Sequence, residues 1–357
     1  SKEDAVEQDT VSENDLEQEE DKDNWEGTGH KAPELEMQLT SAMISEKREL
    51  KGTSERLQKL EKNVQYVANE AVFLASSKKY AETVAEGYGA SLESCEDGVA
   101  VMSFSDEVTD IIAMAEDEKV KLPAVYPNYW YTTCNDIVVY SDGVPIEDGN
   151  VAMVVNNDPF LASSSQGYQY YHEEIHSTAA WNYNDMAGSG IKVAVIDSGI
   201  QKNHVELKGK ASASVTYSSP YNKAEDNNGH GTHVSGIIAA NANNDEGGAG
   251  IAYKASIVSY KALEQNPATG GAGGSTADII KAVNASVKSG ARVINMSLGG
   301  HYYDALFEAT VDTAVNKGVV VVAAAGNEAA QLSRTTNDTN YCSPACFENV
   351  ITVSAKQ

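Results

Sequence analysis

Hydrophobic and polar positions alternate in two different ways along the chain. Between about residue 67 and residue 133, short apolar stretches are separated by polar turns and amphipathic segments. The pattern there predicts helices at residues 78–87 and 106–118 and extended segments at 98–104 and 122–133. Beyond residue 175 the apolar runs become more continuous, which indicates a second and larger unit.

The larger unit has the pattern of a parallel sheet covered by helices. Runs such as Val319-Val320-Val321-Val322 carry no polar alternation, which is typical of strands that are buried on both faces. Strands are expected at residues 193–196, 255–263, 292–298, 318–325 and 350–354, and helices at 230–242, 276–288 and 304–316. This alternation predicts an α/β fold with a doubly wound parallel sheet.

The start of the smaller unit fits two structures. Apolar residues between 57 and 74 recur at intervals of three and four, as in a short coiled coil, but residues 67–74 also fit a strand. The compact alternation that follows favours the strand and predicts a β-α-β-β-α-β domain of about 70 residues. We therefore expect an acidic, largely disordered or helical region at residues 1–62, a small α+β domain at 63–135, a linker at 136–165 and the α/β domain at 166–357.

Composition narrows the possible partners. The chain is 41% hydrophobic with 28 glycines, which suits a globular α/β protein, and its formal charge of −26 opposes binding to nucleic acid or to an anionic membrane. Much of the acidic charge lies before residue 24, among few apolar residues, and predicts a solvated tail. No run of about 18 apolar residues is present, so we expect no membrane span. We expect no organic cofactor.

An acid and a base stand at positions that a sheet would bring together. Asp197 ends a buried strand, and His230 lies where a glycine-flanked loop enters the helix expected at 230–242. Each alone is ordinary, because an Asp after a strand often forms a turn and a His before a helix is often a surface residue. Together, at the carboxyl edge of one sheet, they form the pair that a carboxylate-oriented histidine base requires.

Four motifs in order resemble those of the subtilisin-like serine proteases. They are Val195-Ile196-Asp197-Ser198-Gly199-Ile200, His230-Gly231-Thr232-His233-Val234-Ser235-Gly236, Asn295-Met296-Ser297-Leu298-Gly299-Gly300 and Ala324-Ala325-Gly326-Asn327. From the roles known in subtilisin itself, the resemblance implies that Asp197 orients the imidazole, His230 takes the proton of a serine nucleophile, and Asn327 donates its amide to the oxyanion. His233 resembles a second, structural histidine.

The resemblance also implies a site for extended protein or peptide substrates. A peptide laid between two strand edges is held by main-chain hydrogen bonds, and small residues allow a close approach. The two segments that resemble those edges are Ser297, Leu298 and Gly299, and Ala272, Gly273 and Gly274. Without the resemblance, residues 270–274 fit a flexible loop as well.

Calcium is a further expectation drawn from the family. Glu206 falls where a carboxylate ligand is common, and Asn244 and Glu246 belong to an oxygen-rich loop after the active-site helix. A plain acidic surface loop is the alternative. We expect a structural role for calcium if it binds.

The small domain resembles the family's propeptide, which acts as folding chaperone and intramolecular inhibitor. About 20 residues more than the family pattern, with Cys134 at their start, separate it from Asn156-Asn157-Asp158, so the processing site stays open between these points. The family implies a secreted protein. Cys342 and Cys346 fall near the base of the expected specificity pocket, and neither their pairing nor that of Cys95 and Cys134 follows from the sequence.

The family's nucleophile motif, Gly-Thr-Ser-Met-Ala-x-Pro, does not occur in the 357 residues, and Gly52-Thr53-Ser54 is no substitute for it. We therefore expect that these residues are part of a longer zymogen and are catalytically silent alone. Two other classes stay open. A non-catalytic protein could use the cleft as a peptide groove, or a metal-dependent hydrolase could use Asp197, His230 and His233.

Overall fold

The structure is a computed structural model. It describes residues 66–105, 122–134, 157–183, 186–217, 223–267, 270–336 and 338–355. The predictions for residues 1–62, for a helix at 106–118 and for most of the 136–165 linker lie outside the described residues. None of the helices within these ranges is long and apolar enough to cross a membrane.

The first part of the chain is a four-stranded antiparallel sheet with one described helix. Its elements are β1 (Tyr66–Leu74), α2 (Lys78–Gly87), β2 (Ser91–Glu96), β3 (Val99–Ser103) and β4 (Tyr126–Thr133). The strand order is β2-β3-β1-β4, so the stretch at residues 67–74 is a strand. The hydroxyl of Ser77 caps the first turn of α2 by accepting a hydrogen bond from the Tyr80 N–H.

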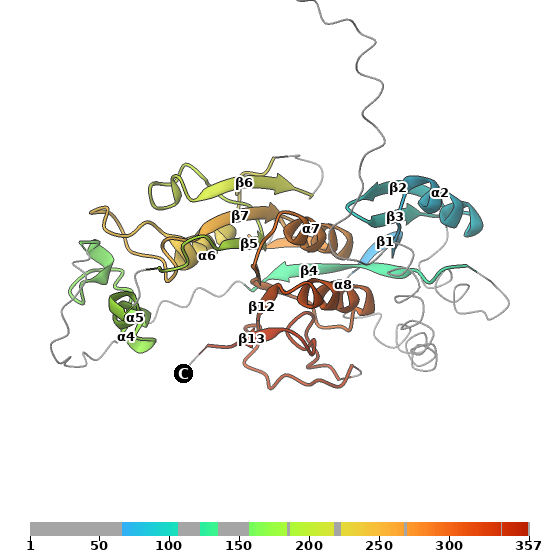
Figure 1. Cartoon of the computed structure of the whole chain (residues 1–357). Helices are drawn as coiled ribbons and strands as arrows, with labels where there is room; N and C mark the ends of the chain where they lie inside the picture. Colours follow the sequence, from blue (N-terminus) through green and yellow to red (C-terminus); the bar gives the residue numbers. More distant parts are fainter. Residues whose placement is uncertain are drawn as a thin grey trace, which may run out of the picture.

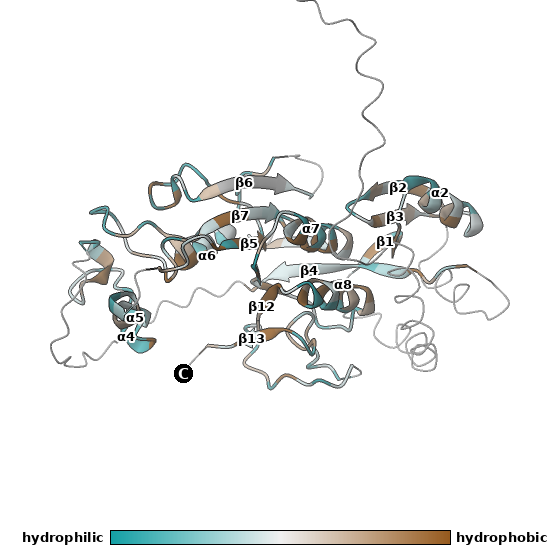
Figure 2. Ribbon diagram, in the orientation of Figure 1, coloured by the Kyte–Doolittle hydropathy of each residue, from teal (hydrophilic) through white to brown (hydrophobic). Residues whose placement is uncertain are grey.

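The second part is built on a six-stranded parallel sheet with the order β13-β12-β10-β5-β7-β6. Its strands are β5 (Lys192–Asp197), β6 (Ala211–Thr216), β7 (Ser256–Lys261), β10 (Val293–Met296), β12 (Val320–Ala324) and β13 (Ile351–Val353). The predicted parallel sheet is therefore confirmed. In Figure 2, β12 and β13 are hydrophobic, as the continuous apolar runs predict.

Helices cover both faces of this sheet. On β5, Val193 and Val195 pack in a cluster with residues of α6 (His230–Ala239), whereas Ala194 and Ile196 pack in the large core with α7 (Thr276–Lys288) and α8 (Ala305–Asn316). Successive side chains of a strand point to opposite faces, so the two clusters define the two layers. The fold is doubly wound.

Short elements connect these layers. They are η2 (Pro159–Leu161), α4 (Tyr171–Glu174), α5 (Ser177–Tyr183), η3 (Val205–Leu207), β8 (Glu264–Gln265), β9 (Ala272–Ser275) and β11 (Leu298–Gly299). The stretch at 292–298, predicted as one strand, is divided: β10 stays in the parallel sheet, and β11 leaves it to pair with β4.

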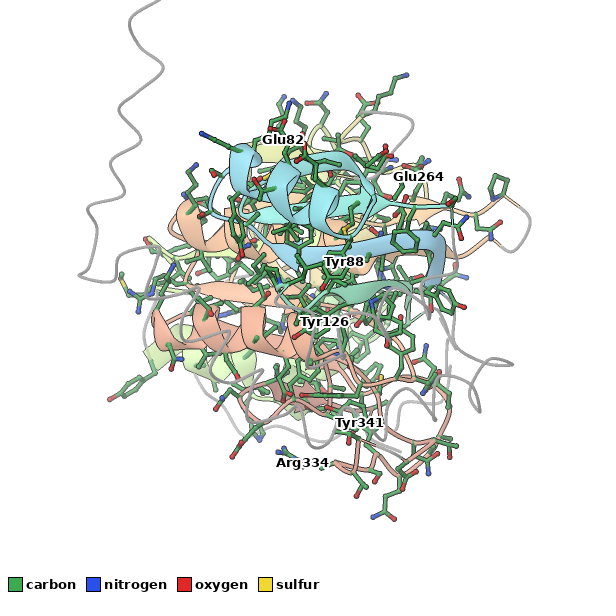
Figure 3. All side chains as sticks on the ribbon, turned by 90° about the vertical axis from the view of Figure 1, so that its right-hand side faces the viewer. Glu82, Tyr88, Tyr126, Glu264, Arg334 and Tyr341 are labelled. Atoms are coloured by element: carbon green, nitrogen blue, oxygen red, sulfur yellow. The ribbon has the colours of Figure 1, made fainter. Side chains whose placement is uncertain are left out.

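Strand β4 connects the two parts. Figure 1 shows it running from the small domain to the middle of the molecule, between α7 and α8. In the view of Figure 3, Tyr88 lies within the small domain and Tyr126 lies close to its border with α8. Tyr126, Tyr129 and Tyr131 of β4 belong to the same large core as α7 and α8. The end of the small domain is therefore packed into the larger one.

Candidate active site

The acid and the base predicted from the sequence lie in contact. Nδ1 of His230 is 2.8 Å from Oδ1 and 3.0 Å from Oδ2 of Asp197, and the Asp197 side chain is fully buried. Asp197 ends β5 and His230 begins α6, so the carboxyl edge of the sheet places both. The prediction that the sheet brings them together is confirmed.

A glycine permits this contact. A Cβ at Gly231 would lie 2.3 Å from the carbonyl oxygen of Gly199 and 3.1 Å from the Asp197 Cβ. Any larger residue would push the first turn of α6 away from the end of β5. The residue before the helix, Gly229, has φ 99° and forms its N-cap in the left-handed region, which suits glycine. The Gly-His-Gly sequence thus has a geometric basis.

Asp226 holds the loop that presents His230, and sequence reasoning missed it. Its carboxylate accepts hydrogen bonds from the Ser198 hydroxyl, from the N–H groups of Asn228, Gly229 and Thr232, and from the Thr232 hydroxyl, at 2.5 to 3.0 Å. Burial alone would raise the pKa of Asp226, but these donors outweigh it, and the pKa is lowered. The signal was present as an acidic residue four positions before His230.

The electrostatics of the pair favour a protonated imidazole. Burial works against the charged form of His230, yet the hydrogen bond and negative charge of Asp197 and a hydrogen bond to the backbone of Cys134 outweigh that effect. The pKa of His230 is therefore raised above its usual value. The backbone of the last described residue of the small domain thus lies at the candidate base.

The two predicted substrate-binding segments lie on either side of β4. On one side β9 pairs antiparallel with it, with Gly274 opposite Tyr131 and Gly273 opposite Thr132. On the other side β11 pairs with it, with Leu298 opposite Thr133, and the Cys134 N–H donates to the Ser297 carbonyl at 3.2 Å. Ala272 also donates its N–H to the Thr133 hydroxyl at 3.4 Å. A segment of the chain itself fills the groove between them.

Asn327 follows β12 in an exposed loop at the same carboxyl edge of the sheet. Its neighbour Glu328 forms an ion pair with His301, with 3.3 Å between Oε1 and Nε2. Burial raises the pKa of the Cys134 thiol to about 11, and the Glu328 and Asp197 carboxylates add to that rise. Two carboxylates at this edge of the sheet, Asp197 and the Glu328 neighbour of Asn327, thus act on the Cys134 thiol.

All four cysteines lie within the described residues, and each is a free thiol. Cys342 and Cys346 are buried, with the Cys342 N–H 3.4 Å from Sγ of Cys346. The Sγ of Cys342 lies against Gly299, where a Cβ would approach it to 2.9 Å. Burial raises the pKa of the Cys342 thiol to about 12, so this thiol is neutral near pH 7.

The proposed calcium ligands are placed differently from one another. Glu206 is buried, and its carboxylate accepts hydrogen bonds from the Asn244 amide and the Gly248 N–H at 3.2 and 3.1 Å. Glu246 is exposed. The loop at residues 243–248 is also held by Asp158, which is buried beside it. The Asp158 carboxylate accepts hydrogen bonds from the N–H groups of Asn243 and Asn244 at 2.8 and 3.0 Å. From the sequence, Asp158 is assigned to the linker and its processing region, whereas the structure has it buried.

The carboxylate and amide oxygens beside this loop are of the type that binds a hard cation. Burial raises the pKa of Glu206, and the negative charge of Asp158 adds to the rise, so two carboxylates share a small volume. Asp158, Glu206 and the Asn244 amide would supply oxygen ligands of the type that calcium takes. Over the described ranges, however, no group of three or more His, Cys, Asp and Glu side chains could hold a metal, and His233 is exposed.

A doubly wound sheet with an Asp–His pair at its carboxyl edge, and an extended strand held between two strand edges, is the arrangement that the resemblance to the subtilisin-like proteases predicts. Residues 188–357 match the Subtilase family. This part of the chain is therefore similar to the subtilases.

Relatives of known name agree with this assignment. Thermitase of Thermoactinomyces vulgaris is 38% identical over 199 residues, which cover 56% of this chain and 64% of thermitase. The thermophilic serine proteinase of Bacillus sp. (strain AK1) is 40% identical over 226 residues, covering 58% of this chain and 53% of that protein. The chain thus spans less than two thirds of the length of the relatives it matches.

Among solved structures, the fold is similar to that of fervidolysin from Fervidobacterium pennivorans, a keratinolytic enzyme related to subtilisin. The TM-score is 0.55 and the identity 22%, over 74% of this chain and 40% of that one. At this identity the likeness concerns the fold alone.

Proposed function

We propose that this chain carries the acid and the base of a serine endopeptidase that is made as a propeptide-inhibited zymogen. Asp197 holds and stabilises the protonated imidazole, His230 acts as general base and then general acid, and Asn327 donates to the oxyanion. The observation that carries the proposal is that β4 lies between β9 and β11 and ends with the Cys134 backbone at His230. A peptide substrate would take the place of β4.

The proposal places the nucleophilic serine outside residues 1–357. The family's serine motif does not occur in these residues, and the chain spans only part of its relatives. The 357 residues by themselves would then not hydrolyse peptides. The catalytic tests below therefore use the longest natural form of the protein.

Casein hydrolysis by that form tests the reaction class. We expect it to be blocked by a serine-directed phosphonate and to persist with a chelator selective for transition metals. Inhibition by the chelator alone would indicate the metal-dependent hydrolase instead. Tight peptide binding without any hydrolysis would indicate the non-catalytic peptide-binding protein.

The position of Cys134 also predicts where the zymogen is processed. Because the Cys134 backbone lies at His230, we propose that the first cleavage breaks the bond after Cys134, rather than one near Asn156-Asn157-Asp158. A first cleavage near Asn156-Asn157-Asp158 is less well supported, because the Asp158 side chain is buried and accepts two backbone hydrogen bonds. N-terminal sequencing of early products should find Asn135 as the first residue, and a His230→Ala variant should stay uncleaved. A first product that begins beyond residue 150 would contradict this.

We further propose that the protein is secreted and that calcium stabilises it through Asp158, Glu206 and Asn244. Secretion rests on the resemblance to the family and is tested by locating the protein in the medium of its source cells. The calcium proposal rests on the two buried carboxylates of Asp158 and Glu206, which both accept hydrogen bonds from the loop at residues 243–248.

A further inference from the structure

We infer that the protease recognises a tyrosine at the fourth residue before the cleaved bond, by donation of the tyrosine hydroxyl to the buried carboxylate of Asp304. The inference rests on the proposed function, because it takes β4 as the stand-in for a substrate. With cleavage after Cys134, Tyr131 occupies that fourth position. The recognition site consists of Thr276, Tyr302, Asp304 and Phe307, which we call the Tyr131 pocket.

The pocket closes around the whole ring of Tyr131. Tyr131 is 0% exposed, and its ring packs edge-on against Tyr302 and Phe307, with centroid distances of 5.2 and 5.4 Å. Tyr302 also stacks on Tyr129 at 4.5 Å and donates its hydroxyl to the Trp130 carbonyl. Aromatic side chains gain from such edge contacts beyond the area they bury. The shape of the pocket therefore selects a single aromatic ring.

A polar group at the end of the pocket distinguishes tyrosine from phenylalanine. The Tyr131 hydroxyl donates to Oδ2 of Asp304 at 2.9 Å, and the Thr276 hydroxyl donates to the same oxygen at 2.7 Å. Asp304 is only 1% exposed, so water does not replace a missing donor. Phenylalanine would fill the same volume but leave that oxygen with one donor fewer, and an unsatisfied buried acceptor is costly.

The carboxylate is fixed by the fold rather than by the strand that fills the groove. Its other oxygen, Oδ1, accepts the Phe307 N–H at 3.0 Å and so caps the first turn of α8. Thr276 is the first residue of α7. All four pocket residues belong to the part of the chain that matches the Subtilase family. The pocket would thus face any peptide that replaced β4.

Burial raises the pKa of the Asp304 carboxyl, although the Phe307 N–H, Thr276 and Tyr131 lower it in part. The loss of the Tyr131 hydroxyl would remove one of these stabilising donors. A ligand that supplies a hydroxyl at this point is therefore favoured for the same reason that Tyr131 is.

Two peptides test the inference on the longest natural form of the protein. One repeats residues 131–134 ahead of a cleavable reporter, and the other has phenylalanine in place of the tyrosine. We expect kcat/KM to be about tenfold to hundredfold higher for the tyrosine peptide, as for a hydrogen bond to a charged buried acceptor. Casein hydrolysis is measured in parallel.

Variants separate recognition from folding. Asp304→Ser keeps a capping oxygen for α8 but removes Oδ2, and should abolish the tyrosine preference. Thr276→Val removes the resident donor to Oδ2, so the preference should grow. Asp312→Asn, an exchange on the outer part of α8 beside Asn349, should leave it unchanged.

The outcomes distinguish the two proposals. Equal cleavage of both peptides by the unaltered enzyme, or failure to cleave either while casein is digested, would overturn the tyrosine inference alone. Absence of all hydrolysis, casein included, would overturn the proposed function. Because the peptide comparison uses the unaltered enzyme, it stands even if Asp304→Ser does not fold.

Discussion

Individual residues of this site act through partners that lie far apart in the sequence. Asp197 and His230 are 33 positions apart, and their contact depends on Gly231 and on the loop that Asp226 holds. Buried Lys261 adds to the same support, because its ammonium group donates to the Glu225 carbonyl and the Asn227 amide oxygen at 3.0 and 2.7 Å. The His230 imidazole is thus held by Asp197, and the loop that carries it is held by a network of further hydrogen bonds.

Replacement of Asp197 by Asn tests the orientation of the base. The exchange keeps the size of the side chain but removes the charge and favours the wrong tautomer of His230, so we expect kcat/KM to fall by about 10⁴-fold. The measurement is peptide hydrolysis by the longest natural form. Asp312→Asn serves as the matched control, and a loss of less than tenfold in Asp197→Asn would contradict the assigned role.

The pH profile of the same enzyme reports the His230 pKa. A general base must be neutral to accept a proton, and in the enzyme from which β4 has left, the hydrogen bond and charge of Asp197 still raise the pKa of His230. Activity should therefore be present at alkaline pH and fall as the pH drops through that raised pKa. A competitive peptide inhibitor whose carbonyl replaces that of Cys134 should bind better at the lower pH, since binding favours the protonated imidazole. An inhibition constant independent of pH would contradict this linkage.

At the level of elements, β9 and β11 pair antiparallel with the two sides of β4. Strand β4 itself runs between α7 and α8 (Figure 1). Two glycines of β9, Gly273 and Gly274, allow this close packing of strands. A Cβ at Gly273 would lie 2.3 Å from Nε1 of the Trp130 side chain, whereas one at Gly274 would lie 1.9 Å from the Ala262 carbonyl oxygen. Neighbouring glycines thus meet different partners, one on the bound strand and one in the framework.

This difference predicts two different alanine phenotypes. Gly273→Ala should chiefly weaken binding in the groove and raise the inhibition constant of a peptide with the sequence of residues 130–134 by about tenfold, or about 1.4 kcal/mol. Gly274→Ala should lower the melting temperature, because backbone must move. The inhibition constant is measured on each variant in the otherwise unaltered enzyme, and the melting temperature is measured in a His230→Ala background, which prevents self-digestion. Equal effects of the two variants on both quantities would contradict the assignment.

The elements that the sequence predicted well are those with a strong pattern. The helix at 276–288 and the strand at 193–196 follow from their hydrophobic periodicity, and α7 occupies the predicted span. Helix α6 ends at Ala239 rather than at residue 242, because the Asn241 N–H bonds to the Glu206 carbonyl instead. Strands β2 and β6 have the sequences SLESCE and ASASVT, whose small and polar residues give little signal.

Site residues that stand in a sequence motif could be predicted, whereas residues whose role depends on a tertiary contact could not. Asp197 and His230 stand in glycine-rich motifs at a sheet edge, so their proximity follows from the strand order. Asp158 and Asp226 lie in loops without periodicity, and their roles depend on which backbone N–H groups the fold turns toward them. Likewise, no spacing rule connects Tyr131 with Asp304 across 173 positions.

At the level of the whole molecule, two segments from before residue 188 are built into the subtilase part. The small domain enters through β4, and the segment around Asp158 holds the loop at residues 243–248. His172 strengthens the second attachment, because this buried imidazole bonds to the Ala249 carbonyl at 3.0 Å. A ligand at Asp158 would therefore stabilise the attachment of one segment to the rest.

Calcium should act at this second attachment. An ion that binds only the folded state at 100 times its Kd adds about 2.7 kcal/mol to the free energy of unfolding, and for a protein of this size that raises Tm by about 5 °C. We expect this rise in the His230→Ala background when calcium replaces chelator. Asp158→Asn and Glu206→Gln should abolish the response, whereas Glu246→Gln should keep it, because Glu246 is exposed and the other two carboxylates are buried. A response lost with Glu246→Gln but kept with Asp158→Asn would return the ligand set to the one that the sequence predicted. The absence of any response in the unaltered protein would show instead that the two carboxylates serve only to hold the loop.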